Sequence, residues 1–358
     1  LNSIYLFRKI RSTMTQVELR YVLAEDQDQR LDRWLKRNFP SLNQIKIEKL
    51  CRKGEIRINS CRVKPSKRLV LGEVIRIPPL GVIRVISQPE IKKFSEADIR
   101  MMKDSVVYSD NHILVINKPP GLAVQGGSGQ KDRHVDSLIE ILAEAQFEKP
   151  RLVHRLDKDT SGILLLAKDR KTAELLTKSF RSKSVRKIYW ALVAGVPQTN
   201  VGTIRLSLIK QRLSSGNEKM LCIPKIEEIN YPDAKRSVTD YVVIEKISQR
   251  TTWLGLSPIT GRTHQLRCHL SAIGCPIIGD TKYGSKEQTN NGDGWGAQIG
   301  GVISRKLHLH ARSVTFEHPI THEPLFIEAD LPNHMATAWK TFNWNLKWAP
   351  KDPFKIYE

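Results

Sequence analysis

The sequence predicts an α+β protein in which a small basic domain precedes a larger domain with a mixed, largely antiparallel sheet. The chain has 358 residues, enough for about two domains of ordinary size. Basic residues gather in residues 29–78, whereas from residue 105 onward short apolar runs are mixed with helical patterns without strict alternation. No apolar run reaches the roughly 18 residues that a membrane-spanning helix needs, so we expect no membrane partner.

The charge of the chain predicts a polyanionic partner, with nucleic acid ahead of an anionic membrane surface. The formal net charge is +21. Residues 29–78 hold 14 Lys and Arg against 4 Asp and Glu, a net charge of +10 in a seventh of the chain. A face that serves only solvation usually mixes both signs, so this excess favours contact with an RNA backbone.

Residues 29–78 show the pattern of two helices and two short strands. Apolar residues at helical spacing predict the first helix (Leu31, Trp34, Leu35). Ser41 is the expected N-cap of a second helix, which Gly54 ends. Strands are expected at 56–58 and 74–77.

The flanking segments are expected to lie outside the two domains. We expect residues 1–28 to form a partly disordered extension, residues 79–104 a linker rich in Pro and Gly, and residues 346–358 a C-terminal tail. Residues 1–17 carry three basic residues and no acid, which is typical of a short mitochondrial presequence. We favour a start near Met14 and hence a cytoplasmic protein, with the mitochondrial matrix as the alternative.

The larger domain is expected to span residues 105–345. Short apolar runs predict strands (106–108, 113–116, 163–167, 188–193, 238–247, 252–256). Helical patterns predict helices (135–145, 172–179, 263–272, 334–342). Residues 285–301 are rich in Gly and Asn and are interpreted as a flexible loop.

Three short segments carry the candidate chemistry. Residues 151–162 (RLVHRLDKDTSG) form a polar loop between apolar strands. Taken alone, Asp157 and Asp159 are compatible with metal binding, a nucleophile or a surface salt-bridge loop, and the salt-bridge loop is the commonest of the three. In residues 186–189 (RKIY), Lys187 and Tyr189 project to one face of a strand. In residues 257–270 (SPITGRTHQLRCHL), Thr263 is the expected cap of a helix that carries Arg267 one turn inside.

The cysteines and histidines do not form a recognisable metal or disulfide pattern. The five cysteines are scattered and make no CxxC pair, which predicts neither a disulfide framework nor a cysteine zinc site (Cys51, Cys61, Cys222, Cys268, Cys275). His264 and Cys268 have the spacing of zinc ligands on a helix, but no second ligand pair accompanies them. A reducing compartment and a metal-free site are therefore expected.

The residues of these segments resemble two known families. Residues 154–162 (HRLDKDTSG) and 116–124 (INKPPGLAV), together with the two later segments, resemble the RluA-type pseudouridine synthases. Residues 124–129 (VQGGSG) and 153–166 follow the RluC-like subgroup, whose members act on large-subunit ribosomal RNA. Residues 30–35, 54–59, 63–64 and 71–75 resemble the S4 RNA-binding domain.

The resemblance implies a role for each site residue. Asp157 matches the essential carboxylate, Tyr189 the aromatic residue under the target base, and Arg267 the arginine that lies against the aspartate. Four further residues match substrate-binding positions (Arg155, Lys187, Leu266, His154), and Arg155 is expected to fill the gap that the target base leaves in the RNA. The S4-like part is expected to bind RNA through basic residues (Arg30, Arg33, Lys49, Arg52, Lys53, Arg57, Lys64).

The implied reaction is an isomerisation of uridine in structured RNA, most plainly in large-subunit ribosomal RNA or its assembly precursor. The glycosidic bond is broken, the uracil turns, and the uracil is rejoined to the ribose through its C5 atom. No redox step, cofactor or metal is therefore implied. The protein is expected to be a monomer. Asp157 can serve as a nucleophile or abstract a ribose proton, and the sequence does not choose between these routes. A non-catalytic RNA-binding or ribosome-assembly protein and a glycosidic hydrolase using Asp157 and Asp159 stay open as alternatives.

Overall fold

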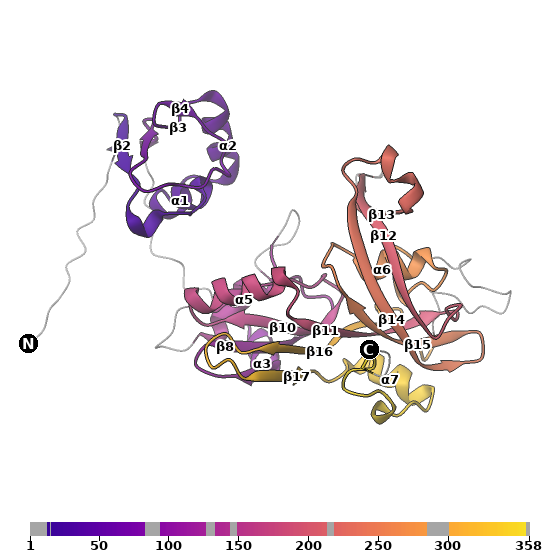
Figure 1. Cartoon of the computed structure of the whole chain (residues 1–358). Coiled ribbons are helices and arrows are strands. Elements are labelled where there is room, and N and C mark those ends of the chain that lie inside the picture. The colour runs from indigo at the N-terminus through magenta and orange to yellow at the C-terminus, as the bar shows by residue number, and fades with distance from the viewer. Residues whose placement is uncertain are drawn as a thin grey trace, which may run out of the picture. The chain divides into compact units, whose positions relative to one another are not determined.

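A computed structural model describes residues 13–14, 16–82, 94–126, 133–143, 149–212, 218–284 and 301–355. The chain divides into two compact units, residues 1–93 and residues 94–358 (Figure 1). Within the described residues, no helix has both the length and the apolar character that crossing a membrane requires.

The first unit packs two helices on a small antiparallel sheet. The helices are α1 (Leu31–Asn38) and α2 (Gln44–Lys53). The sheet has the order β2-β5-β3-β4, with its strands in the order of the chain at Glu18–Tyr21, Arg57–Ile58, Cys61–Arg62 and Val74–Ile77. A 3₁₀ turn at Ala24–Asp26 precedes α1, and β1 (Thr13–Met14) pairs with β6 (Gly81–Val82).

The predicted helices and strands of this unit are present, with two corrections. Asn43, not Ser41, caps α2, because its side chain accepts a hydrogen bond from the backbone N–H of Lys46 at 2.8 Å. Gly54 ends α2 in the left-handed conformation, as expected. Strand β2 lies within the segment that the sequence assigned to an N-terminal extension, where it pairs with β5.

The second unit is built on one mixed sheet that runs through its described residues. The main path has the order β13-β12-β14-β15-β11-β16-β10-β8-β7, while β17 pairs with β16 and β9 with β10. The bounds along the chain are β7 Val106–Ser109, β8 Ile113–Lys118, β9 Arg151–Leu152, β10 Ser161–Ala167, β11 Arg186–Ala194, β12 Val201–Arg212, β13 Glu218–Ile223, β14 Lys235–Ile247, β15 Thr251–Pro258, β16 Leu309–Glu317 and β17 Pro324–Glu328. Only β10 and β16 pair in parallel among these strands, so the predicted mixed, largely antiparallel sheet is confirmed.

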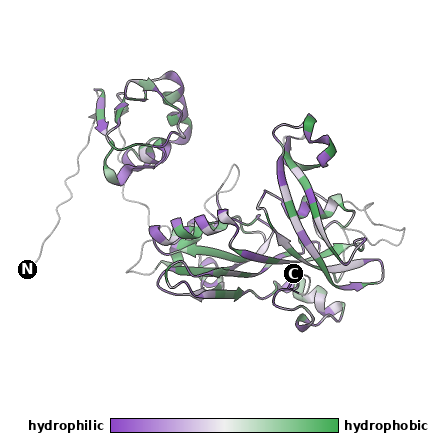
Figure 2. Cartoon of the chain, in the orientation of Figure 1, coloured by the Kyte–Doolittle hydropathy of each residue, from purple (hydrophilic) through white to green (hydrophobic). Residues whose placement is uncertain are grey.

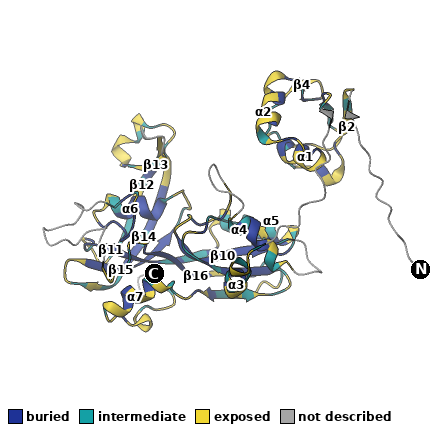
Figure 3. Ribbon diagram, turned by 180° about the vertical axis from the view of Figure 1, so that it is seen from behind, coloured by how far each residue is buried: buried dark blue, intermediate teal, exposed yellow. Residues whose placement is uncertain are grey.

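Helices cover the sheet and leave its central strands buried. They are α3 (Glu96–Asp104), α4 (Val135–Leu138), α5 (Arg170–Ser182), α6 (Gln265–Ala272) and α7 (Asn333–Thr341), with 3₁₀ turns at Ile139–Leu142, Lys225–Asn230 and Leu346–Trp348. Apolar residues line the inner strands, whereas α5 shows hydrophilic and hydrophobic stripes (Figure 2). Buried residues follow the strands, and the turn between β13 and β14 is exposed (Figure 3).

Strand β11 separates two apolar clusters. Its even-numbered residues 188–194, which include Trp190, pack with α7 and with three further tryptophans (Trp253, Trp339, Trp344). Its odd-numbered residues Tyr189, Ala191 and Val193 pack with Leu266 and Leu270 of α6. Since successive residues of a strand point to opposite faces, Lys187 and Tyr189 share the face that α6 covers.

A close approach of two strands fixes the position of the loop that precedes β10. Gly162 of β10 has φ +106 and pairs with Ala311 of β16. A Cβ atom added at Gly162 would lie 2.2 Å from the carbonyl oxygen of Ala311. Only glycine permits this approach, so the loop at 154–160 is anchored at the centre of the sheet.

Several boundaries in the second unit differ from the predicted ones. Residues 94–104, assigned to a linker, belong to this unit and include α3. The segment assigned to a tail packs on the unit, because Phe354 is buried and Asp352 pairs with Arg186. The helix expected at 135–145 is a short α4 followed by a 3₁₀ turn, and most of the loop predicted at 285–301 lies outside the described residues.

Candidate active site

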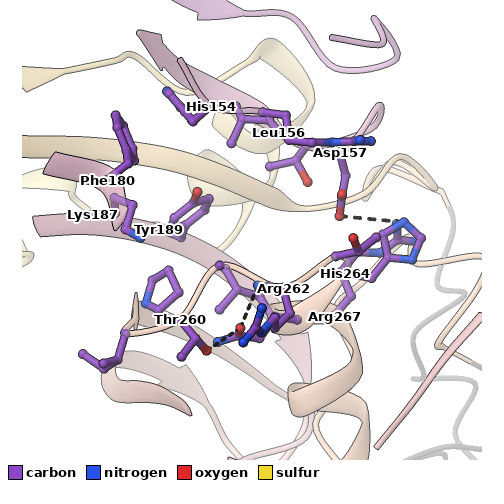
Figure 4. Close-up of a pocket in the computed structure, with 18 of the residues that line it drawn as sticks. His154, Leu156, Asp157, Phe180, Lys187, Tyr189, Thr260, Arg262, His264 and Arg267 are labelled. Atoms are coloured by element: carbon purple, nitrogen blue, oxygen red, sulfur yellow. Dashed lines mark hydrogen bonds and ion pairs between the residues drawn. The ribbon is translucent and has the colours of Figure 1, made fainter. Parts of the chain in front are cut away.

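A cavity of about 510 Å³ opens over the central strands of the second unit. Its walls come from the loop 154–160, the end of α5, strand β11, and the segment 258–264 that leads into α6 (Figure 4). These segments are far apart in sequence and meet because β11, β16 and β10 are neighbours in the sheet.

His154 holds the loop 154–160 against β10. Its Nε2 accepts a hydrogen bond from the backbone N–H of Leu165 at 2.9 Å, and its ring stacks on Phe180 with centroids 4.4 Å apart. Burial, assisted by the charge of Lys187, lowers the pKa of His154 to about 3, so the ring is neutral. His154 was expected to bind substrate. It does line the cavity, but the nitrogen that faces the sheet is already occupied by the backbone.

A buried lysine ties the same loop to the end of β8. Lys118 is fully buried, and its Nζ donates to the carbonyl oxygens of Pro119, Leu122 and Lys158 at 2.9, 2.8 and 3.0 Å. Burial lowers its pKa to about 7, against the opposing charges of Asp159 and Asp157. Three carbonyl acceptors match the three N–H donors of an ammonium group, so Lys118 fixes the backbone next to Asp157.

Two side chains of β11 form the floor of the cavity. Lys187 and Tyr189 both line it, as their two-residue spacing predicted. Burial, with the charge of Asp157, raises the pKa of Tyr189, so its hydroxyl stays protonated at neutral pH. Burial, followed by the charge of Lys183, lowers the pKa of Lys187.

The start of α6 supplies the opposite wall. The helix begins at Gln265, and its N-cap is His264 in the left-handed conformation at φ 51, so the prediction that Thr263 caps this helix is wrong. The Gln265 side chain organises the preceding turn: its Oε1 accepts from the Thr260 hydroxyl at 2.7 Å and from the Arg262 N–H at 3.0 Å. Leu266 lies at the cavity wall and is buried, as expected.

Arg267 is fixed by a carboxylate that the sequence did not indicate. Its Nε and Nη2 donate to the two carboxylate oxygens of Asp280 at 2.7 and 2.8 Å. Burial acts to lower the pKa of Arg267, but the hydrogen bonds and charge of Asp280 outweigh it and raise the pKa. The expected direct contact with Asp157 is therefore corrected: Arg267 pairs with Asp280 and acts on Asp157 only through its field at longer range.

Asp157 faces His264 across the cavity. The Asp157 Oδ2 and His264 Nε2 atoms are 3.9 Å apart (Figure 4). His264 Nδ1 lies 2.9 Å from the Tyr283 hydroxyl oxygen, which also accepts the backbone N–H of Met220 at 3.0 Å. When the Tyr283 hydroxyl donates its proton to Nδ1, a neutral imidazole carries its own proton on Nε2, toward Asp157. Burial is the largest influence on the pKa of His264 and lowers it.

The cavity gathers all seven residues that the sequence assigned to catalysis and substrate binding in this unit (Asp157, Tyr189, Arg267, Arg155, Lys187, Leu266, His154). Asp159 is exposed and does not line it, so the paired carboxylates of a hydrolase do not meet here. Three groups around the cavity were missed: Lys118, His264 as a partner of Asp157, and Asp280. The sequence signal for Asp280 is a lone acid that directly follows the apolar run 275–279.

The seven basic residues expected to bind RNA lie in the first unit, and they differ in whether their side chains are already engaged by other groups of the protein. Arg30 pairs with Asp32, Lys53 with Glu55, and Arg57 donates to the carbonyl oxygens of Gly54 and Ser60. The other four are exposed and make no ion pair within the described part of the chain (Arg33, Lys49, Arg52, Lys64). Those four are free to meet phosphates.

The thiols and histidines near α6 do not form a metal centre. All five cysteines are free, and Cys268 lies with its Sγ 2.6 Å from the Sγ of Cys222 on β13, a neighbour that sequence spacing did not reveal. Among the residues that the structure describes, no group of three His, Cys, Asp or Glu side chains is arranged to hold a metal ion.

Comparisons with known proteins point to one family. Residues 112–272 match the family model of the RNA pseudouridylate synthases. The ribosomal large subunit pseudouridine synthase C of Vibrio vulnificus (strain CMCP6) is 37% identical over 318 residues, which cover 88% of this chain and 94% of that protein. The protein of the same name from Yersinia pestis is 36% identical over 320 residues, covering 89% of this chain and 93% of that protein.

A solved structure shows the same fold. The human RNA pseudouridylate synthase domain containing 4 matches with a TM-score of 0.54 and 27% identity, over 69% of this chain and 96% of that chain. Sequence identity over nearly the whole of both chains, a shared fold and a cavity that holds the expected residues agree with one another. The chain therefore belongs to the RNA pseudouridylate synthase family, as an RluC-like member of its RluA-type branch.

Proposed function

We propose that this RNA isomerase converts specific uridines of large-subunit ribosomal RNA into pseudouridine, with Asp157 as the catalytic carboxylate. The substrate follows from the relatives, which are named ribosomal large subunit pseudouridine synthases. The observation that carries the role of Asp157 is its place in a cavity whose other polar groups face it: the Nε2 of His264, the Tyr189 ring and the field of Arg267.

The reaction balances without an added group. The bond between N1 and C1′ breaks, a bond between C5 and C1′ forms, and the proton that C5 loses is matched by one that N1 gains. An ionised Asp157 serves either as the nucleophile or as the base that takes a ribose proton. In both routes the positive charge of the buried Arg267 stabilises the ionised carboxylate of Asp157. The two hydrogen bonds to Asp280 keep the Arg267 guanidinium in a fixed position.

Tyr189 is suited to hold the uracil while it turns. The target uridine must leave its stack to reach the cavity, which costs a few kcal/mol. A tyrosine ring on the floor offers a flat apolar surface to the freed base, and Leu266 bounds the same space. Lys187 and Arg155 line the cavity as well, where cations can meet the adjoining phosphates or, for Arg155, the gap left in the RNA.

The first unit is the proposed RNA anchor, an S4-like domain. Four of the seven predicted RNA-binding residues are exposed and without acidic partners among the described residues, which supports this role. We further propose that the enzyme acts as a monomer, needs neither metal nor cofactor, and works in the bacterial cytoplasm, where its relatives' hosts assemble ribosomes.

Mapping of pseudouridine tests this function. Ribosomal RNA from cells with and without the gene is compared at single-nucleotide resolution, and sites in the large-subunit RNA should disappear with the gene and return with the wild-type copy. Product analysis with the purified enzyme should yield pseudouridine in intact RNA. Release of free uracil would indicate a hydrolase, and binding without any product would indicate a non-catalytic RNA-binding protein.

A further inference from the structure

A second hollow adjoins the catalytic cavity. It is lined by Lys183, Arg205, Arg236, Val238, Asp240, Ile259, Thr260 and Arg262, and its volume is about 570 Å³. We propose that this hollow, the basic groove, is a subsite for the sugar-phosphate backbone of the RNA strand that flanks the target uridine. The proposal rests on the proposed function, because it extends the path of the same RNA substrate.

The basic groove is continuous with the catalytic cavity. The two hollows share Lys183, Ile259, Thr260 and Arg262. Lys183 stands at the end of α5 in the left-handed conformation, and Arg262 lies in the turn before α6. When the target nucleotide of an RNA strand occupies the catalytic cavity, the nucleotides next to it can therefore lie directly in the basic groove.

Unpaired positive charge dominates the groove. It has four cations and one carboxylate, and that carboxylate is engaged, because Asp240 accepts a hydrogen bond from the Thr203 hydroxyl at 2.7 Å. Arg205 and Arg236 are exposed and have no acidic partner in the described ranges. Arg262 makes only a long contact, 3.5 Å from its Nε to the carbonyl oxygen of Arg236. Cations without internal partners call for an external anion.

The spacing of the two strand arginines suits successive phosphates. Arg205 of β12 pairs directly with Val238 of β14, and Arg236 lies two residues before Val238, so the arginines are diagonal neighbours on one face of the sheet. Diagonal neighbours are about 7 Å apart, close to the separation of successive phosphates along one strand. None of the described residues that line the groove is aromatic and could stack on a base, so backbone contact is favoured over base recognition.

The test compares charge-removing and charge-keeping variants of the full-length enzyme. The variants are R205Q with R236Q, R205K with R236K, and R100Q with K340Q. The last pair removes two charges from α3 and α7, from exposed residues that line neither hollow. Binding of one short structured RNA that contains a modified site is measured over a range of salt concentrations, and turnover is measured on the same RNA.

We expect the two glutamines in the groove to reduce the salt slope of log K by about 1.4 to 1.8, the value for two lost phosphate contacts. KM should rise about tenfold or more, while kcat at saturating RNA stays within about threefold of wild type, because binding to a phosphate is sequence-independent and precedes the chemical step. The lysine pair should keep the wild-type slope, and so should the control pair.

Two results would overturn the proposal: an unchanged slope in the glutamine pair, or an equal loss of slope in the control pair. If the R205Q and R236Q variant folds poorly, the R205K and R236K variant decides whether the groove binds phosphate. A reduced salt slope of log K in that variant would contradict phosphate binding, because both positive charges are kept. The proposed function fails separately. Wild-type enzyme that binds RNA with the full slope but makes no pseudouridine would remove the reaction and leave the groove intact.

Discussion

At the level of single residues, the proposed catalytic side chains depend on neighbouring residues that hold them in position. Asp157 and Tyr189 are recognisable from their segments, because the residues around them resemble a known signature. Asp280 is not, since it lies 13 residues after Arg267 and only folding brings the two charges together. His264 was considered only as a metal ligand, yet its Nε2 faces Asp157.

The ion pair of Arg267 and Asp280 should be costly to break. Both side chains are buried, and removal of one partner leaves an uncompensated charge, so D280N should reduce the free energy of unfolding by about 3 to 5 kcal/mol. Urea unfolding of D280N, R267M and the double variant gives the coupling energy. The double variant should lose clearly less free energy of unfolding than the sum of the single losses, and simple additivity would contradict a direct pair.

Tyr189 should act through its ring. Replacement by leucine keeps apolar volume but removes the flat surface, and base stacking is worth about 1–3 kcal/mol. We therefore expect Y189L to lose roughly 10- to 100-fold in turnover, with little change in RNA affinity, because most affinity comes from phosphate contacts. Single-turnover kinetics at saturating RNA measure this loss, and near-normal turnover would rule out the platform role.

At the scale of elements, apolar periodicity was a good guide where one strand buries only apolar residues. β10 and the core of β11 were predicted because residues 163–167 and 188–193 are apolar runs. β16 was not, because its buried positions include His310 and Arg312, which look exposed in sequence. These polar groups are buried with partners: His310 contacts the Ser161 hydroxyl at 2.9 Å, and Arg312 lies over the Trp190 ring at 4.4 Å.

The strands β12 and β13 were missed for a related reason. Their exposed ends interrupt the alternation that marks a strand, as the partly exposed pattern of Val201–Arg212 shows. The helix caps also differed, since Asn43 and His264 replace Ser41 and Thr263. A cap depends on backbone geometry that neighbouring residues of similar type can provide equally well.

The buried histidine of β16 predicts a pH dependence of stability. Burial lowers the pKa of His310 to about 3, whereas an unfolded histidine titrates near 6.5. Between these values the unfolded chain binds a proton that the folded chain does not, so the stability is fully present above pH 6.5 and is lost as the pH falls. The slope from one such group is about 1.4 kcal/mol per pH unit.

Urea unfolding from pH 7 to pH 4.5 measures this slope, and H310Q should reduce it by about 1.4 kcal/mol per pH unit in the acidic range. H322Q changes a mostly exposed histidine and serves as the control. A slope that H310Q leaves unchanged would show that His310 takes up its proton in the folded state as easily as in the unfolded one.

At the scale of the whole molecule, the charge distribution was the strongest guide to the partner. The first unit concentrates basic residues, and four of the seven predicted RNA-binding residues are exposed and lack acidic partners among the described residues (Arg33, Lys49, Arg52, Lys64). The division into two units was also expected, although the boundary lies near residue 93 and not at residue 104.

Salt dependence should report this charge directly. Replacing the four residues by glutamine should reduce the salt slope of log K for ribosomal RNA by about 3 to 4, because each phosphate contact contributes about 0.9. Turnover on a short RNA that reaches only the catalytic cavity should be nearly unchanged. The R100Q and K340Q pair again provides the control, and equal slopes for all three proteins would assign the basic residues of the first unit another role.

The D157N variant tests whether the Asp157 carboxylate drives uridine isomerisation. This substitution removes the charge and keeps the shape, so RNA affinity and the melting temperature should match those of the wild type. Pseudouridine formation is measured on one large-subunit ribosomal RNA fragment under single-turnover conditions, with enzyme in excess. The wild-type protein should convert its target uridine, whereas D157N should form no detectable pseudouridine. Retention of even about a tenth of the wild-type rate by D157N would rule out the catalytic role of Asp157, since loss of an essential charged group costs far more than tenfold.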